Sequence, residues 1–196
     1  MTCTLSSAFF APVQWYQKLL RYDRVFIEHC DSYVKQTYRN RCLIATTNGV
    51  QALTVPVSID STKNICISDH GNWRHQHWQA LQSAYGDSPF FEYYEDDLHP
   101  FFTERWQRLY DYNEAIRLKM CELLDIEPHV EPTTTYVANP ENDFREAIQP
   151  KHPAADADFT ARRYYQVYER KNGFQPNLSI LDLLFNMGPE AVLWLV

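Results

Sequence analysis

The sequence predicts an α/β protein with a Rossmann-like layered fold: a mixed, mostly parallel sheet, a β-hairpin insertion and flanking helices. Strand-like and helix-like segments alternate from the N-terminus, which is typical of a parallel layer. Asn48-Gly49 separates two apolar runs, and this dipeptide is a strong hairpin signal. Residues 106–126 carry an apolar stripe at helical spacing. With 196 residues, the chain is long enough to bury a core.

The N-terminal segments predict a strand, a helix and a second strand. Residues 3–10 form a short apolar run that ends before Pro12. Large apolar side chains recur at helical spacing over 13–23, so a helix is expected just after the proline. Residues 24–30 are rich in β-branched and aromatic side chains, as strands are. This order is the opening of a parallel α/β layer.

The middle of the chain predicts antiparallel strands followed by helices. The elements expected here are strands at about 41–46, 51–57 and 64–69, a helix between Asn72 and Gly86, an irregular or briefly helical stretch at 88–102, and a helix at 106–126. Asn is a common N-cap and Gly a common helix end, which sets the bounds of the first helix. Pro56 limits pairing near the end of the second strand.

The last third predicts one strand, an irregular stretch and a short helix. A strand is expected at 129–137, which closes a main α/β domain at 1–137. Apolar periodicity is absent from 138–161, which is rich in Pro, Asp and Ala and is expected to be a linker or irregular loop. Residues 162–196 are expected to pack on the main domain, with a helix that stops at Gly188-Pro189.

Composition and charge argue against several classes of protein. A net charge of −7 is opposite to the basic field that nucleic-acid binding needs. No apolar run approaches the roughly 18 residues of a membrane span, and no signal peptide is recognised, so a cytoplasmic protein is expected. Five cysteines without a CxxC pair are expected to be reduced core residues, and no metal site is predicted. The sequence names no cofactor.

The strongest candidate site is "DSYVKQTYRNR", residues 31–41. If this segment is extended, alternation gives it two faces, one with Lys35, Thr37, Arg39 and Arg41 and the other with Gln36, Tyr38 and Asn40. A row of cations at this spacing fits a phosphate, a pyrophosphate or a carboxylate. A charged edge strand that prevents sheet-to-sheet pairing explains the pattern equally well.

Two histidines lie in the helix predicted between Asn72 and Gly86. His75 and His77 are two residues apart, so they point about 200° apart and do not bind one metal ion. His77 shares a face with Trp73 and Leu81. It is either a buried histidine in a packed aromatic face or an acid/base whose pKa can be tuned near neutrality. The acidic run "EYYEDD" further on is expected to be a solvated turn.

Four stretches resemble the WbqC-like protein family, in order and over most of the chain: "YVKQTYRNRC", "TTNGVQALTVPV", "NWRHQHWQALQSAYGDSPFFEYYEDD" and "LSILDLLFNMGPE". Members of this family occur in bacterial gene clusters for O-antigen and other surface polysaccharides. One activity proposed for them is transfer of an amino acid, glycine in particular, onto a sugar. The motif residues that this resemblance carries over are Lys35, Tyr38, Asn40, Arg41, Pro56, Trp73, His77 and Asp182.

The resemblance implies a transferase that moves an acyl or aminoacyl group onto a sugar-linked or nucleotide-linked intermediate. In this interpretation Lys35, Arg39 and Arg41 hold a phosphate or carboxylate. Asn40 orients the acceptor, His77 takes the proton of the attacking group, and the substrate-binding residues also include Tyr38 and Trp73. The alternative is a non-catalytic subunit that binds a sugar nucleotide or another enzyme of a polysaccharide pathway. The first loop lacks the His that many members have there, which favours this alternative.

Overall fold

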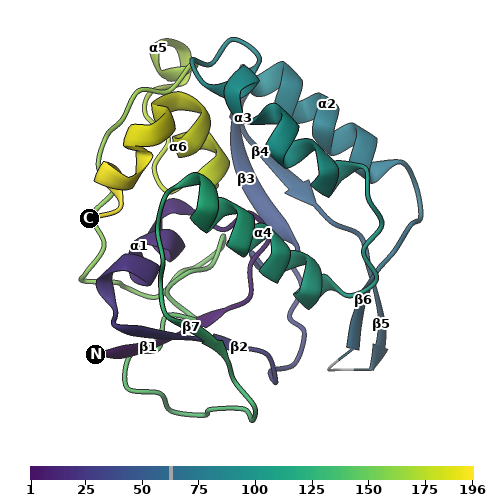
Figure 1. The fold of residues 1–196 in the computed structure, drawn as a ribbon, viewed down its shortest axis with the longest axis vertical. Coiled ribbons are helices and arrows are strands. Elements are labelled where there is room, and N and C mark those ends of the chain that lie inside the picture. Colours follow the sequence, from purple (N-terminus) through teal and green to yellow (C-terminus); the bar gives the residue numbers. More distant parts are fainter. Residues whose placement is uncertain (62–63) are drawn as a thin grey trace.

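A parallel sheet of three strands forms one side of the molecule, which a computed structural model describes over residues 1–61 and 64–196 (Figure 1). Its strands are β1 (Thr2–Ser6), β2 (Arg24–Glu28) and β7 (Val130–Pro132), in the order β1-β2-β7. Helix α1 (Val13–Arg21) connects β1 to β2, because parallel neighbours need a crossover. The predicted strand–helix–strand order is therefore confirmed, although β1 ends at Ser6 and not at residue 10.

Two antiparallel pairs lie outside this sheet. β3 (Arg41–Thr46) pairs with β4 (Gly49–Thr54), and β5 (Val57–Ser61) pairs with β6 (Asn64–Ile67). The single strand predicted at 51–57 is wrong, since β4 ends before Pro56, which has no N–H to donate, and β5 begins after it. Parallel and antiparallel pairing thus occupy separate sheets instead of one mixed sheet. The Rossmann-like layering and the hairpin as an insertion stay predictions.

The turn between β3 and β4 needs a glycine. Thr46 and Gly49 pair across it, and Gly49 has a φ of 105°, a conformation that L side chains rarely adopt. The Thr46 hydroxyl donates to the Gly49 carbonyl oxygen at 2.9 Å. Asn48-Gly49 therefore marks the hairpin turn, as the sequence predicted, although the strand begins at the glycine itself.

The remaining helices lie above the β1-β2-β7 sheet in the view of Figure 1. In chain order they are α2 (Trp73–Tyr85), α3 (Phe91–Leu98), η1 (His99–Phe102), α4 (Leu109–Leu123), α5 (Glu169–Asn172), α6 (Ile180–Met187) and η2 (Gly188–Trp194). Asn72 stands at the cap position of α2, but its side chain makes no cap hydrogen bond. The predicted helix at 106–126 is shorter, because Arg108 before it is extended. Over residues 1–61 and 64–196, no helix combines the length and apolar character needed to cross a membrane.

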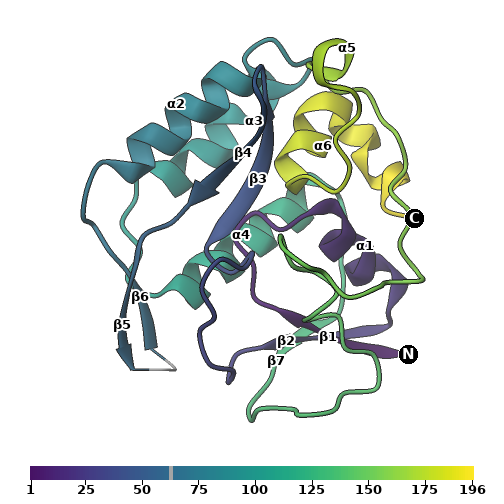
Figure 2. The same cartoon turned by 180° about the vertical axis from the view of Figure 1, so that it is seen from behind.

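The segment 138–161 has almost no regular structure, yet it packs tightly on the sheet and α1 (Figure 2). Phe144 and Ile148 are buried, and backbone hydrogen bonds join Thr4 to residues 142 and 144. The Lys18 ammonium, fully buried in α1, pairs with the Asp156 carboxylate at 2.7 Å. Three buried apolar residues (Phe144, Ala147 and Ile148) and one ion pair leave no periodicity in the sequence, so the pattern indicated only a loop. The division into domains stays a prediction.

Candidate functional site

The carboxyl ends of the parallel strands carry a large hollow. The chain segments that follow β1, β2 and β7 meet there and line a cleft of about 670 Å³. Ligands of open α/β sheets bind outside the carboxyl ends of the strands. The volume also falls within the several hundred Å³ of typical small-molecule pockets. This cleft is therefore the candidate site.

The cleft combines aromatic rings, hydroxyls and charges. Its aromatic, hydroxyl and charged residues are Trp15, Tyr38 and Tyr136; Ser6, Ser7, Ser32 and Thr37; and Asp31, Arg39, Asp143, Arg145 and Glu146. Tyr136 is 56% exposed, and the Arg145 guanidinium lies 5.1 Å from the centre of its ring. Rings beside hydrogen-bonding groups suit a polar, ring-bearing ligand such as a sugar.

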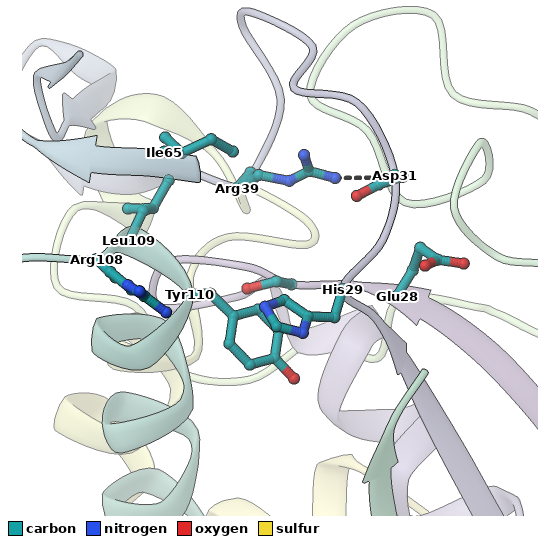
Figure 3. Close-up of a pocket in the computed structure, with 9 residues that line it drawn as sticks. Glu28, His29, Asp31, Arg39, Ile65, Arg108, Leu109 and Tyr110 are labelled. Atoms are coloured by element: carbon teal, nitrogen blue, oxygen red, sulfur yellow. Dashed lines mark hydrogen bonds and ion pairs between the residues drawn. The ribbon is translucent and has the colours of Figure 1, made fainter. Parts of the chain in front are cut away.

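A smaller cavity of about 50 Å³ adjoins the cleft and shares Ser7, Asp31 and Arg39 with it (Figure 3). Its other lining residues are Glu28, His29, Ile65, Arg108, Leu109 and Tyr110. We call it the inner cavity. The His29 imidazole lies against the Tyr110 ring, with 3.9 Å between the two ring centres. The inner cavity thus joins the end of β2 to the start of α4.

Glu28 supports both hollows from below the surface. Its carboxylate is fully buried and accepts hydrogen bonds from the Thr133 hydroxyl at 2.7 Å, the Cys30 amide at 2.8 Å and the Arg145 guanidinium at 3.2 Å. These donors tie the end of β2 to the end of β7 and to the segment after it. The sequence analysis missed Glu28. The only signal was one acidic residue at the end of an apolar strand.

Arg39 and Asp31 form an ion pair that lines both hollows (Figure 3). Their side chains are 9% and 19% exposed, and the Arg39 guanidinium also donates to the Ser32 carbonyl oxygen at 3.3 Å. Burial raises the pKa of the Asp31 carboxyl, and the charge of Arg39 offsets this only in part. The pair therefore places a strong anion-binding group and an easily protonated carboxyl at the junction of the cleft and the inner cavity.

The expected alternation along residues 31–41 does not hold. The segment turns instead of extending: Gln36 has a φ of 64°, and the Thr37 hydroxyl donates to the Val34 carbonyl oxygen at 3.1 Å. The turn sends the predicted residues in two directions. Tyr38 and Arg39 line the cleft. The others line a separate shallow hollow of about 360 Å³, which we call the outer hollow: Lys35, Asn40 and Arg41.

The residues of the outer hollow also bind the hairpin. The buried Asn40 amide donates to the Val55 carbonyl oxygen at 2.8 Å, and the Val55 amide donates back to Asn40 at the same distance. The Arg41 guanidinium donates to the Thr54 hydroxyl at 3.1 Å. Lys35 is exposed. The structure thus gives Asn40 and Arg41 local partners on β4 and just after it.

Trp73 and His77 face the core from α2, and among the described residues they line neither the cleft nor the inner cavity. The His77 ring lies 5.1 Å from that of Trp73 and 6.1 Å from that of Phe9. Burial lowers the pKa of His77 to about 4, so its imidazole is neutral at pH 7. Its Nδ1 is buried without a hydrogen-bond partner in the described structure. The predicted acid/base role of His77 stays a prediction.

Metal ligands are scarce in the part of the chain that the structure describes, and two of the thiols are poor nucleophiles. Over residues 1–61 and 64–196, no group of three or more His, Cys, Asp or Glu side chains could hold a metal ion. All five cysteines are free. Burial raises the pKa of Cys3 to about 12 and that of Cys121 to about 11, so these two thiols are not nucleophiles at neutral pH.

One comparison with known proteins identifies a family. The profile of the WbqC-like protein family matches residues 7–155 and 151–193. The uncharacterized protein Rv1507c of Mycobacterium tuberculosis is 29% identical over 212 aligned residues, which cover 93% of this chain and 92% of that relative. No solved structure gives a significant match. The first matched range contains the loops that line the cleft, apart from Ser6.

Proposed function

Because the chain belongs to the WbqC-like protein family, we propose that it is a transferase of bacterial surface-polysaccharide biosynthesis. It moves an acyl or aminoacyl group, glycine in particular, onto a sugar-linked or nucleotide-linked intermediate. One observation carries the proposal: a cleft of about 670 Å³ lies at the carboxyl ends of the parallel strands, and a buried arginine lines it. Both the volume and the position suit a small-molecule substrate.

The lining supports this chemistry group by group. The Arg39 guanidinium can bind a phosphate or carboxylate through two parallel hydrogen bonds. The rings of Tyr38 and Tyr136 can pack against a sugar. In the transfer, an amine or hydroxyl of the sugar attacks the acyl carbon and loses its proton to a base. The leaving group of the activated donor departs with the electrons of its bond to that carbon.

Two residues compete for the role of that base. Asp31 lines the cleft, and burial raises the pKa of its carboxyl, which makes the carboxylate a better proton acceptor. His77 is the base that the sequence predicted, but its ring lies among Trp73 and Phe9. A transfer assay by mass spectrometry with Asp31→Asn and His77→Phe decides between them, since undiminished product removes either residue from the mechanism.

Two arginines two residues apart test the location of the site. Nucleotides and sugar nucleotides are screened by thermal shift against wild type, Arg39→Gln in the cleft, and Arg41→Gln and Lys35→Ala in the outer hollow. A ligand near 100 times its Kd should raise the melting temperature by roughly 5 to 10 °C. We expect this shift to survive in the two outer-hollow variants and to be lost in Arg39→Gln.

The control for folding replaces both members of this ion pair by amides, as Asp31→Asn with Arg39→Gln. The double variant leaves neither member behind as an unpaired charge. Loss of the ligand shift in Arg41→Gln and Lys35→Ala alone would move the site to the outer hollow. The absence of any shift in wild type would contradict a sugar-nucleotide site in the cleft.

The second candidate is a non-catalytic binding or assembly subunit of the same pathway. The position of His77 away from the cleft favours it, because the predicted acid/base then has no route to the ligand. The two candidates differ in one result. Tight binding of a sugar nucleotide without transfer from any activated acyl donor supports the binding subunit.

A further inference from the structure

We propose that the Ser7 hydroxyl donates a hydrogen bond to the acyl carbonyl oxygen of the substrate, and that Asn113 is the positioning residue that aims it. The inference rests on the proposed function, because it assigns one contact of the substrate in the cleft. Ser7 lines both the cleft and the inner cavity, and only 3% of it is exposed. Asn113, on α4, is 2% exposed and is not among the lining residues of either hollow. Neither residue was predicted as a site residue from the sequence.

The Asn113 side chain joins two loops that line the cleft. Its amide nitrogen donates to the Ser7 hydroxyl oxygen at 3.0 Å and to the Arg39 carbonyl oxygen at 2.8 Å. Ser7 follows β1 and Arg39 follows β2, and the two bonds span 106 and 74 positions of the sequence. A backbone bond of 2.9 Å from the Phe9 amide to the Tyr38 carbonyl oxygen fastens the same two loops. The Ser7 hydroxyl is therefore held in place relative to Arg39.

The Arg39 carbonyl oxygen determines which way the Asn113 amide faces. A carbonyl oxygen only accepts hydrogen bonds, so the nitrogen of the amide, and not its oxygen, lies 2.8 Å from it. This orientation holds although it leaves the Asn113 oxygen buried without a partner among the described residues. The second N–H of the same group then donates to the Ser7 oxygen. Ser7 is therefore the acceptor in this bond.

The Ser7 hydroxyl consequently has a proton to donate. Within residues 1–61 and 64–196, no group accepts a hydrogen bond from it. A buried hydroxyl without an acceptor costs free energy, and an acceptor oxygen of a ligand in the cleft removes that cost. Because the Ser7 oxygen already accepts from Asn113, its O–H bond is polarised and the hydroxyl is a better donor.

An acyl carbonyl oxygen is the acceptor that suits this donor. In the proposed transfer, the amine or hydroxyl of the sugar attacks the acyl carbon while a base takes its proton. The π electrons of the carbonyl move onto its oxygen, and they return when the leaving group departs with the electrons of its bond. A preorganised donor stabilises the negative charge that develops on that oxygen. The neutral hydroxyl also leaves the Arg39 guanidinium for the charged group of the substrate.

The test is an NMR titration of the full, ¹⁵N-labelled chain with three neutral probes: acetamide, N-acetylglucosamine and glucose, which has no carbonyl in its ring form. We expect the first two, but not glucose, to shift the backbone amide signal of Ser7 and the side-chain NH₂ signals of Asn113. Ser7→Ala should weaken binding roughly three- to tenfold, as loss of one neutral hydrogen bond does, and Ser7→Thr should retain most of it. Ser88→Ala should leave binding unchanged, because that buried hydroxyl donates to the Tyr85 carbonyl oxygen.

Asn113→Leu separates positioning from direct contact. It should weaken acetamide binding as much as Ser7→Ala does, and adding it to Ser7→Ala should cause no further loss, because Asn113 acts on the ligand through Ser7. If Asn113→Leu does not fold, its NH₂ signals decide in the other chains: they must move in Ser7→Ala and when acetamide is added to wild type. Where transfer is measured, Ser7→Ala should lower kcat by roughly 100-fold and leave KM within a factor of about three.

Four results would overturn the inference: no response to any probe, equal responses to glucose and acetamide, binding that Ser7→Ala leaves unchanged, or NH₂ signals of Asn113 that no probe moves. The outcome is separable from that of the proposed function. Acetamide binding that depends on Ser7, with no sugar or sugar nucleotide bound, retains the hydroxyl contact and rejects the sugar acceptor. Sugar nucleotides that bind through Arg39 and ignore Ser7→Ala do the reverse.

Discussion

Two buried carboxylates show how differently the two ends of this molecule are built. Glu28, beside the cleft, has a cation, since it accepts from Arg145 as well as from neutral donors. Asp182, in α6, has none: it accepts from the Tyr85 hydroxyl at 2.8 Å, the Tyr164 hydroxyl at 2.7 Å and the Gln166 amide at 2.8 Å. Burial raises the pKa of Asp182.

The difference teaches what each region does. Neutral donors around Asp182 hold α2, α6 and the segment near 164–166 together without leaving a charge for a ligand. The cleft end keeps charged pairs near a hollow, where a ligand can exchange with one partner. Asp182 is one of the motif residues that the family resemblance carried over. Its contacts are those of a residue that stabilises the fold.

The largest effect is expected from truncating Asp182. Asp182→Ala leaves two tyrosine hydroxyls and the Gln166 amide without their acceptor in a dry core, so it should cost about 3 to 5 kcal/mol of unfolding free energy. Chemical denaturation measures it. Asp182→Asn keeps one carbonyl acceptor and should lose clearly less. A loss below about 1 kcal/mol in Asp182→Ala would mean that the network contributes little.

His77 is a third case, a buried polar group with neither a cation nor a full set of neutral partners. Its pKa is about 4 when folded and near 6.5 when unfolded, so the unfolded chain binds the proton more tightly. Stability should therefore fall as the pH falls from about 6.5 to about 4, by about 3 kcal/mol. The measurement is the unfolding free energy across this pH range. His77→Phe should remove this slope. An unchanged slope would show that His77 is not the group that causes the pH dependence.

A matched amide substitution sharpens the comparison of the two carboxylates. Glu28→Gln removes the negative charge that faces Arg145, whose side chain is only 9% exposed, so it should cost about 2 kcal/mol. We expect limited proteolysis to cut the segment that follows Val137 faster than in wild type. The reason is that the neutral side chain at position 28 no longer attracts the Arg145 guanidinium, which anchors this segment to β2. Arg145 keeps its ion pair with Asp143 at 2.6 Å in this variant, so adding Arg145→Gln should lower the stability further. If Glu28→Gln loses less unfolding free energy than Asp182→Asn, the charge of Arg145 contributes little to the stability of this region.

The smallest effect is expected in the outer hollow. Arg41→Gln removes one hydrogen bond to Thr54 at the surface, so its unfolding free energy should change by less than about 0.5 kcal/mol. Arg39→Gln, which leaves half-buried Asp31 without its cation, should cost several times more. Parallel denaturation of the two variants measures the ratio. Equal costs would indicate that the ion pair at the cleft is as solvated as a surface contact.

The sequence predicted the elements well where periodicity or turn chemistry is local. The β1–α1–β2 opening, the hairpin at Gly49 and the buried face of α2 with His77 were all expected. The site was predicted only in part, because its contacts are long-range. Glu28 meets Arg145 across 117 positions of the sequence, and a single sequence contains no trace of such a pair. The turn at Gln36 then separated Arg39 from Arg41.

The irregular segment after β7 also affects how a ligand enters. Asp143, Arg145 and Gln149 form one wall of the cleft, and they lie in a stretch held by side-chain anchors and a few backbone bonds rather than by a strand ladder. Such a stretch can open as a cooperative unit of its own, at less free energy than global unfolding. Its amide hydrogens should then exchange faster than those of β1 and β2. The rate of that opening would set how fast a large ligand reaches the cleft.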